Sequence, residues 1–171
     1  DGYLHSGDYA EIDSDGFVKL TGRKSEVFKT STGRKIAPVS IEGIIQQATN
    51  INQVLIIGKD QKYLIALITC LNFKELDNDQ RNEFIKHLKD SIADCVSDLP
   101  RYKSPVGIIV SENDFSIANK ELTSNLKLKR NNILKNYASM IDKIYCELDN
   151  PQSTIHQQPM YFNEKLVLVK L

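Results

Sequence analysis

The chain has 171 residues with 22 basic and 22 acidic side chains, so its formal net charge is zero and no general positive field favours nucleic acid as a partner. Hydrophobic residues make up 41% of the chain, enough for one sizeable core, but the longest apolar runs fall well short of the about 20 residues that span a bilayer. The cysteines Cys70, Cys95 and Cys146 form no CxxC pair, which argues against a zinc ribbon or a disulfide framework and favours reduced, buried thiols.

The first third of the chain predicts two hairpins and a helix. Residues 9 to 22 alternate polar and apolar around the turn Asp13-Ser14-Asp15-Gly16, which predicts a β-hairpin. Residues 27 to 36 form a second, shorter hairpin around a turn that contains glycine. An apolar pattern that follows Pro38 predicts a helix that starts near the proline and ends before Asn50.

The middle of the chain supplies the predicted core. The β-branched runs Gln53 to Gly58 and Tyr63 to Cys70 predict a pair of antiparallel strands. Apolar residues at three- and four-residue spacing predict one long helix from Asp79 to Leu99. A further strand at Val106 to Val110 and a last helix over 134 to 145 complete the pattern. We therefore expect an α+β fold with a small mixed or antiparallel sheet flanked by helices and preceded by a β-hairpin.

Three parts are expected along the chain. Residues 1–24 would be the end of a larger N-terminal domain, 25–145 a C-terminal lid domain, and 146–171 a C-terminal extension of unknown role in which only 166–171 resembles a strand. The chain starts without methionine and within sequence that looks structured, so we expect it to be a piece of a longer protein.

The first motif with chemical content is Gly2-Tyr3-Leu4-His5-Ser6-Gly7-Asp8. It resembles the Gly-Tyr/Trp-x-x-Thr-Gly-Asp motif of the adenylate-forming family, which includes acyl-CoA synthetases, luciferases and peptide-synthetase adenylation domains, although Ser6 replaces the usual threonine. The resemblance implies that Asp8 binds both ribose hydroxyls of ATP, since a carboxylate accepts two O–H bonds at once. Taken alone, the motif suits a solvated loop aspartate equally well.

The second motif runs from Gly22 to Glu42 and resembles the hinge and following loop of fatty acyl-CoA synthetases. The resemblance implies that Arg23 contacts the nucleotide with its fixed guanidinium fork. It places Ser25 at the hinge, where the family usually has aspartate or lysine. It also implies that Gly33 lines the tunnel for the pantetheine arm of CoA, although a glycine that merely closes a hairpin turn fits the same position.

Two further motifs follow in family order. Leu99-Pro100-Arg101-Tyr102-Lys103-Ser104-Pro105 is similar to the family's Tyr-Lys-x-Pro stretch and supports the register. Glu121 to Arg130 is similar to the Leu-Thr-Pro-Thr-Leu-Lys pattern of long-chain synthetases, which aligns Lys127 with the family's catalytic lysine of adenylation. A lysine near other cations at a helix start is ordinarily solvated, so the ordered series of motifs carries this assignment.

No metal site is expected on this chain. The Asp13-x-Asp15-Gly16 turn lacks the closing glutamate of a calcium loop. The histidines His5, His87 and His156 share no metal-ligand spacing.

The resemblance implies a long-chain fatty-acid–CoA ligase. A fatty carboxylate would attack ATP to give acyl-AMP, and CoA would then displace AMP. Mg²⁺ would be bound mainly by the N-terminal domain, which would also be the chain's main protein partner. We expect the fragment alone to be inactive and the protein to be cytoplasmic, which is compatible with peripheral membrane association.

Two alternatives stay open. One is an adenylation domain that loads a carrier protein, which the Leu-Thr-x-x-Leu-Lys form at 122–127 disfavours. The other is a noncatalytic binding module that keeps the lid fold, which neither Ser25 nor residues 146–171 excludes.

Overall fold

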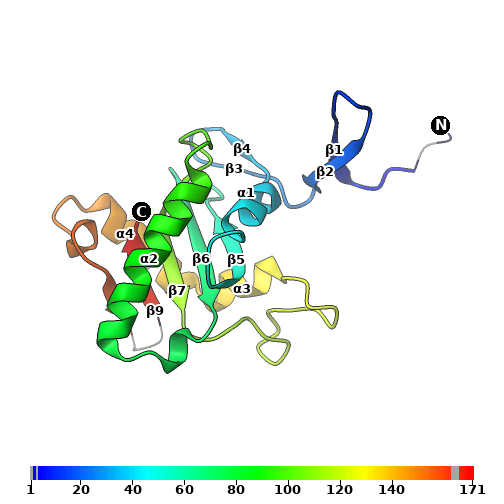
Figure 1. The fold of residues 1–171 in the computed structure, drawn as a ribbon. Coiled ribbons are helices and arrows are strands. Elements are labelled where there is room, and N and C mark those ends of the chain that lie inside the picture. The colour runs from blue at the N-terminus through cyan, green and yellow to red at the C-terminus, as the bar shows by residue number, and fades with distance from the viewer. Residues whose placement is uncertain (1, 3, 163–165) are drawn as a thin grey trace.

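A five-stranded mixed sheet forms the centre of the protein (Figure 1). The computed structural model describes residues 2, 4–162 and 166–171. The strand order is β5-β6-β7-β9-β8. The strands are β5 (Ile51–Ile57), β6 (Leu64–Cys70), β7 (Pro105–Ser111), β8 (Met160–Phe162) and β9 (Leu166–Lys170). Only β6 and β7 pair in parallel, and the other neighbours are antiparallel.

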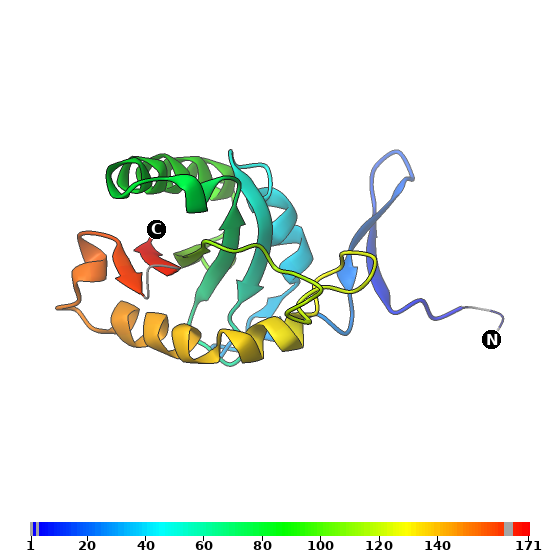
Figure 2. The same ribbon diagram turned by 90° about the horizontal axis from the view of Figure 1, so that it is seen from below.

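Helices cover both faces of this sheet, as Figure 2 shows from below. On one face lie α1 (Pro38–Ile45) and α2 (Asn78–Val96), and on the other lie α3 (Arg130–Asn136) and α4 (Ala138–Asp149). Alternate strand residues enter two separate cores: Val54 and Ile56 of β5 face α1 and α2, whereas Leu55 and Ile57 face α3 and α4. Because both faces are buried, the strands are nearly continuous apolar runs. The predicted α+β fold with a mixed sheet flanked by helices is confirmed.

The helix ends follow local chemistry. Pro38 stands at the first position of α1, where its missing N–H leaves no helical bond unmade. A capping box begins α2: Asp77 accepts from the Gln80 N–H, and the Gln80 side chain accepts from the Asp77 N–H. The α-helix ends at Val96, three residues before the predicted end. Two short 3₁₀ helices, η1 (Phe73–Glu75) and η2 (Thr154–His156), lie in the connections.

The predicted last helix is divided in two. Tyr137 has φ −103° and ψ 10°, which ends α3 and begins α4. At this break the Tyr137 ring packs edge-on against Phe115, with ring centroids 6.1 Å apart, and its hydroxyl lies 3.3 Å from the Ser111 Oγ. The expectation of a single helix was therefore wrong, because the apolar spacing carries through a residue whose ring packs between elements.

Both predicted hairpins are present. The first pairs β1 (Asp8–Ile12) with β2 (Val18–Arg23) and stands away from the sheet (Figure 1). The Asp13 carboxylate closes its turn by accepting from the backbone N–H groups of Asp15 and Phe17. The second pairs β3 (Phe28–Lys29) with β4 (Lys35–Ile36) beside the sheet.

The C-terminal extension completes the sheet. The predicted strand near the C-terminus is present as β9, which lies between β7 and β8 rather than at an edge. Val167, Leu168 and Val169 of β9 are fully buried, and they add to both cores. Residues 146–162 and 166–171 therefore belong to the structural body, while the division of the chain into three parts stays a proposal.

Candidate functional site

Lys127 lies on a tight, hydrogen-bonded turn. The Thr123 N–H donates to the Lys127 carbonyl at 2.8 Å, and the Lys127 N–H donates to the Thr123 Oγ1 at 3.0 Å. Leu122 and Leu128 pair across the base of the turn, and Leu126 has a φ of 59°. The Lys127 side chain is exposed. The turn thus presents an ammonium group to the surroundings from a constrained backbone.

A buried carboxylate fastens this turn to the body. Glu121 is 3% exposed, and its two oxygens accept from the Ser116 N–H at 3.1 Å and from the Asn136 side-chain amide at 3.1 Å. Its carbonyl accepts from the Lys129 N–H at 2.7 Å. Because Asn136 belongs to α3, the turn that carries Lys127 and the helix that follows it are held as one unit.

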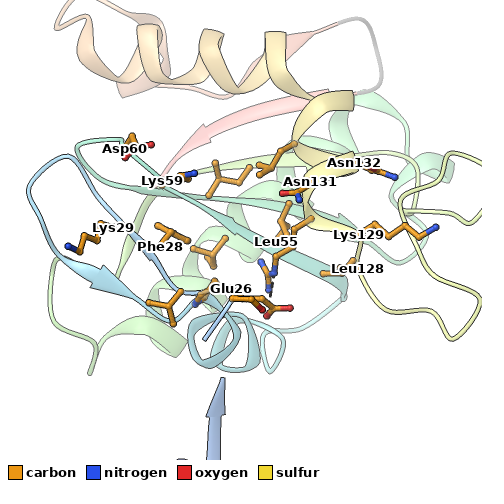
Figure 3. Close-up of a pocket in the computed structure, with 18 residues that line it drawn as sticks. Glu26, Phe28, Lys29, Leu55, Lys59, Asp60, Leu128, Lys129, Asn131 and Asn132 are labelled. Carbon is orange, nitrogen blue, oxygen red and sulfur yellow. Dashed lines mark ion pairs between the residues drawn. The ribbon is translucent and has the colours of Figure 1, made fainter. Parts of the chain in front are cut away.

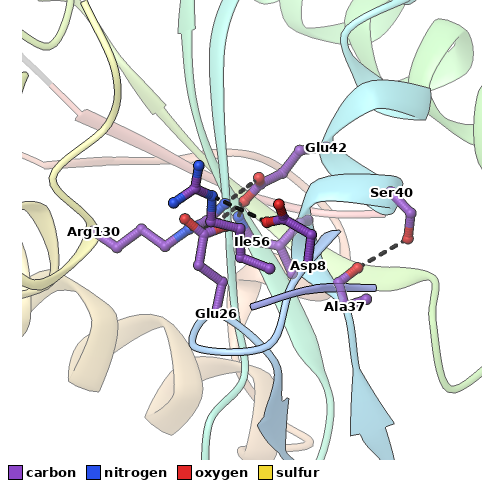
Figure 4. A network of polar contacts seen from close by, with 8 residues as sticks. Asp8, Glu26, Ala37, Ser40, Glu42, Ile56 and Arg130 are labelled. Carbon is purple, nitrogen blue, oxygen red and sulfur yellow. Dashed lines mark hydrogen bonds and ion pairs between the residues drawn. The ribbon is translucent and has the colours of Figure 1, made fainter. Parts of the chain in front are cut away.

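Arg130 starts α3 and joins three segments (Figure 4). It donates two hydrogen bonds to the Glu42 carboxylate of α1, one of them 2.7 Å long. Its Nε lies 3.6 Å from a Glu26 oxygen. The Glu42 Oε1 also accepts from the Ile56 N–H of β5 at 2.7 Å. Burial alone would lower the pKa of Arg130, but its bonds to Glu42 and the charges of Glu42 and Glu26 raise that pKa overall.

Asp8 and Arg23 are brought together. They face one another in the β1–β2 register, and the Arg23 Nε lies 3.4 Å from the Asp8 Oδ1. The Lys24 N–H donates to the Gly7 carbonyl at 2.7 Å, which ties the first motif to the residues before Ser25. Tyr3 of the first motif lies outside the described residues.

Ser25 and Gly33 lie in two exposed turns. Ser25 follows β2, where the Glu26 N–H donates to the Arg23 carbonyl at 3.0 Å. Gly33 closes the β3–β4 turn with a φ of 80°, and its N–H donates to the Thr30 carbonyl at 2.9 Å. That turn is docked separately from Arg130, because the Ser31 N–H donates to the Gln61 carbonyl at 3.0 Å.

An open pocket of about 800 Å³ lies between the Ser25 turn, the end of β5 and the start of α3 (Figure 3). Ser25 and Glu26 line one side, and Leu128, Lys129 and Arg130, which directly follow Lys127, line another. Among the described residues, no hydrogen bond or ion pair connects Lys127, Asp8 and Gly33 with each other. The structure therefore brings together the segments around Ser25 and Lys127, and separately Asp8 with Arg23.

Comparison with known proteins adds the family. Residues 26–149 match the model of the AMP-binding enzyme C-terminal domain. The chain belongs to this family. This match confirms the family relationship that the sequence motifs predicted.

Relatives of this C-terminal domain include two curated proteins. The long-chain-fatty-acid–CoA ligase ACSBG2 of Gallus gallus is 30% identical over 203 residues, which cover 99% of this chain and 27% of that protein. Fatty acyl-CoA synthetase B of Dictyostelium discoideum is 34% identical over 165 residues, which cover 87% of this chain and 24% of that protein. The chain thus spans about a quarter of the length of these relatives.

Solved structures share the fold of this C-terminal domain. The A domain of carboxylic acid reductase from Segniliparus rugosus has a TM-score of 0.70 at 21% identity, over 84% of this chain and 23% of that one. The fatty acyl CoA synthetase of Mycobacterium tuberculosis has a TM-score of 0.51 at 22% identity, over 82% of this chain and 25% of that one.

Three charged residues of this domain were not singled out from the sequence: Glu42, Glu121 and Arg130. A signal exists for Glu42, which lies three residues before Ile45 in the apolar pattern of a predicted helix and so shares the buried face of that residue. A carboxylate in that position requires a buried partner. Its partner, 88 residues later in the chain, is not indicated by any local pattern.

Two features are absent from the part of the chain that the structure describes: a membrane-spanning helix and a cluster of metal ligands. It contains no helix long and apolar enough to cross a membrane. In the same residues, no group of three or more His, Cys, Asp or Glu side chains is arranged to hold a metal ion.

Proposed function

We propose that this domain is the lid of a long-chain fatty-acid–CoA ligase, an AMP-forming acid–thiol ligase. The observation that carries the proposal is the exposed Lys127 on a turn that the buried Glu121 fastens to α3. The relatives named as fatty-acid–CoA ligases support the choice of reaction, and their match extends over nearly the whole chain. Acyl-chain selection belongs to the preceding domain of the complete protein.

Lys127 acts in the first step. The fatty carboxylate oxygen attacks the α-phosphorus of ATP, a bond to that phosphorus forms, and the bond to pyrophosphate breaks. Negative charge is redistributed over the carboxylate and the phosphate during this displacement. A flexible ammonium group that is aimed at this charge by a constrained backbone stabilises the transition state.

Asp8 and Arg23 contribute to nucleotide binding. The Asp8 carboxylate accepts from the ribose hydroxyls, and the Arg23 guanidinium, whose side chain is 63% exposed, is accessible to a phosphate or ribose oxygen. Their mutual ion pair supports this role, because it orients both side chains at one edge of the hairpin before ATP binds.

Ser25 is the pivot between the two steps. Rotation about this exposed turn alternates the Lys127 turn with the Gly33 turn at the active site. In the second step the CoA thiol loses its proton to solvent, its sulfur forms a bond to the acyl carbon, and the bond from that carbon to the phosphate oxygen of AMP breaks. A glycine at 33 permits close approach of the pantetheine arm to the backbone. This scheme divides the chain into 1–24, 25–145 and 146–171.

Mg²⁺ does not fit the side chains of this domain, because the described residues hold no suitable cluster of ligands. We therefore assign no step on this chain to the metal, and we place its site, like the acyl pocket, in the N-terminal domain. A cytoplasmic location completes the proposal.

The test is formation of acyl-CoA by the full-length protein from a long-chain fatty acid, ATP and CoA. We expect acyl-CoA, AMP and pyrophosphate in equal amounts, and no acyl-CoA from the isolated 171 residues. Transfer to a carrier-protein thiol with none to CoA would favour the carrier-loading alternative. Absence of both transfer and pyrophosphate release would favour a noncatalytic module.

A further inference from the structure

Arg130 connects the Lys127 turn to the hinge. It lies three residues after Lys127, at the start of α3. Its guanidinium reaches Glu42 on α1 and Glu26, the residue that directly follows Ser25 (Figure 4). One side chain therefore joins the segment that carries the proposed catalytic amine to the segment that directly follows Ser25.

The geometry of this connection is restrictive. The side chains of Arg130 and Glu42 are only 18% and 11% exposed. Two parallel N–H···O bonds to one carboxylate fix the plane of the guanidinium as well as its distance. The Ile56 N–H donates to the same carboxylate, which fixes Glu42 against β5. A shift of the Arg130 side chain would therefore break its hydrogen bonds to Glu42.

The Gly33 turn is held by other contacts. Backbone bonds join the Asp60 N–H to the Lys29 carbonyl at 2.9 Å and the Ser31 N–H to the Gln61 carbonyl at 3.0 Å. None of these bonds involves Arg130 or Glu42. The two turns that the proposed function uses in alternation are thus fixed to the body independently.

We propose that Arg130 is a positioning residue for adenylation, which holds the Lys127 turn in a fixed place relative to the Ser25 pivot. The inference rests on the proposed function, because it requires Lys127 to act in the first step. Its specific consequence is that loss of Arg130 impairs acyl-AMP formation and spares transfer to CoA. An ion pair that merely stabilised the domain would affect both steps alike.

The experiment measures the two half-reactions separately in the full-length protein. Arg130→Gln removes the charge, Arg130→Lys keeps the charge but not the bidentate fork, and Lys135→Ala, an exposed cation on the same helix, is the matched control. We expect ATP–pyrophosphate exchange to fall by about 10- to 100-fold in Arg130→Gln, with partial recovery in Arg130→Lys. Transfer to CoA from supplied acyl-adenylate should stay near the wild-type rate.

Hydrogen exchange gives a second readout that does not depend on activity. In Arg130→Gln the amides of Thr123, Lys127 and Lys129, which are protected by the turn, should exchange faster. The amides of Thr30 and Gly33 in the β3–β4 turn should exchange at the wild-type rate.

Three outcomes would overturn the positioning role. The first is a wild-type rate of ATP–pyrophosphate exchange in both Arg130 variants, while Lys127→Ala still lowers that rate. The second is a parallel loss of both half-reactions and faster amide exchange throughout the domain. The third is an absence of ATP–pyrophosphate exchange in the wild-type protein, which would overturn the proposed function itself and with it this inference.

Discussion

Asp8 and Arg23 form an ion pair across the β1–β2 hairpin, with the Arg23 Nε 3.4 Å from the Asp8 Oδ1. The sequence predicted a nucleotide contact for each residue on a different motif. The hairpin register places the two opposite one another, so they form one polar edge. This edge leads directly into the turn that contains Ser25.

Asp8→Ala should weaken ATP binding. A hydrogen bond to a charged group contributes about 1.5–3 kcal/mol, so we expect the KM for ATP to rise by about 10- to 100-fold. Asp15→Ala on the same hairpin is the control, because Asp15 is an exposed aspartate in the turn at the far end from Asp8. Equal KM values for ATP in the two variants would remove Asp8 from the nucleotide site.

Gly33→Ala separates backbone strain from a role in CoA binding. A Cβ at Gly33 would have no atom within 4 Å, but the φ of 80° disfavours any side chain. Gly16→Ala is the matched control, since Gly16 has a φ of 86° and equally open surroundings on the other hairpin. Both variants should lose about 1–2 kcal/mol of unfolding free energy.

Only Gly33→Ala should slow transfer from acyl-adenylate to CoA, and it should leave pyrophosphate exchange intact. Equal transfer rates in Gly33→Ala and Gly16→Ala would mean that Gly33 serves the turn alone.

Leu168→Ala should show that the C-terminal extension is part of the core. Leu168 has 0% exposure and pairs with Ile109 of β7 and Met160 of β8. The cavity left by truncation should lower the free energy of unfolding in urea by about 2–5 kcal/mol. Leu71→Ala, at a leucine that is 53% exposed, should change it by less than about 0.5 kcal/mol. Similar losses in the two variants would contradict the role of β9.

Alkaline pH should destabilise the protein. Burial raises the pKa of the Cys70 thiol to about 12, and burial also raises the pKa of the Tyr145 hydroxyl. The unfolded chain therefore releases these protons at lower pH than the folded one, so stability is full at neutral pH and falls above about pH 9. Between its pKa in the unfolded chain and its raised pKa in the folded chain, each such group lowers the free energy of unfolding by about 1.4 kcal/mol per pH unit.

Urea unfolding at a series of pH values above 8 measures this effect. The slope should be shallower in Cys70→Ala than in the wild-type protein. A free energy of unfolding that stays constant up to pH 11 would contradict the burial of these two groups.

The sequence predicted most elements because their signals are local. Pro38 marks the start of α1, and apolar spacing marks α2. The antiparallel pairing of β5 with β6 follows from two β-branched runs separated by a short turn.

What the sequence did not predict depends on distant contacts. The position of β9 between β7 and β8 is set by pairing across more than 50 residues. The bonds of Arg130 to Glu42 join residues 88 positions apart, so no spacing rule indicates them. The break at Tyr137 falls within a continuous apolar pattern, at a residue whose ring contacts Phe115, 22 positions earlier in the chain.

The role of Lys127 in adenylation can be measured by ATP–pyrophosphate exchange in the full-length protein with Lys127→Ala. This exchange reports acyl-AMP formation alone, so it isolates the step in which we propose that the exposed amine acts. We expect Lys127→Ala to lose about 100- to 1000-fold of the exchange rate, which corresponds to about 3 to 4 kcal/mol of transition-state stabilisation, and Lys135→Ala to keep the wild-type rate. Pyrophosphate exchange by Lys127→Ala at the wild-type rate would show that Lys127 has no catalytic role in acyl-AMP formation.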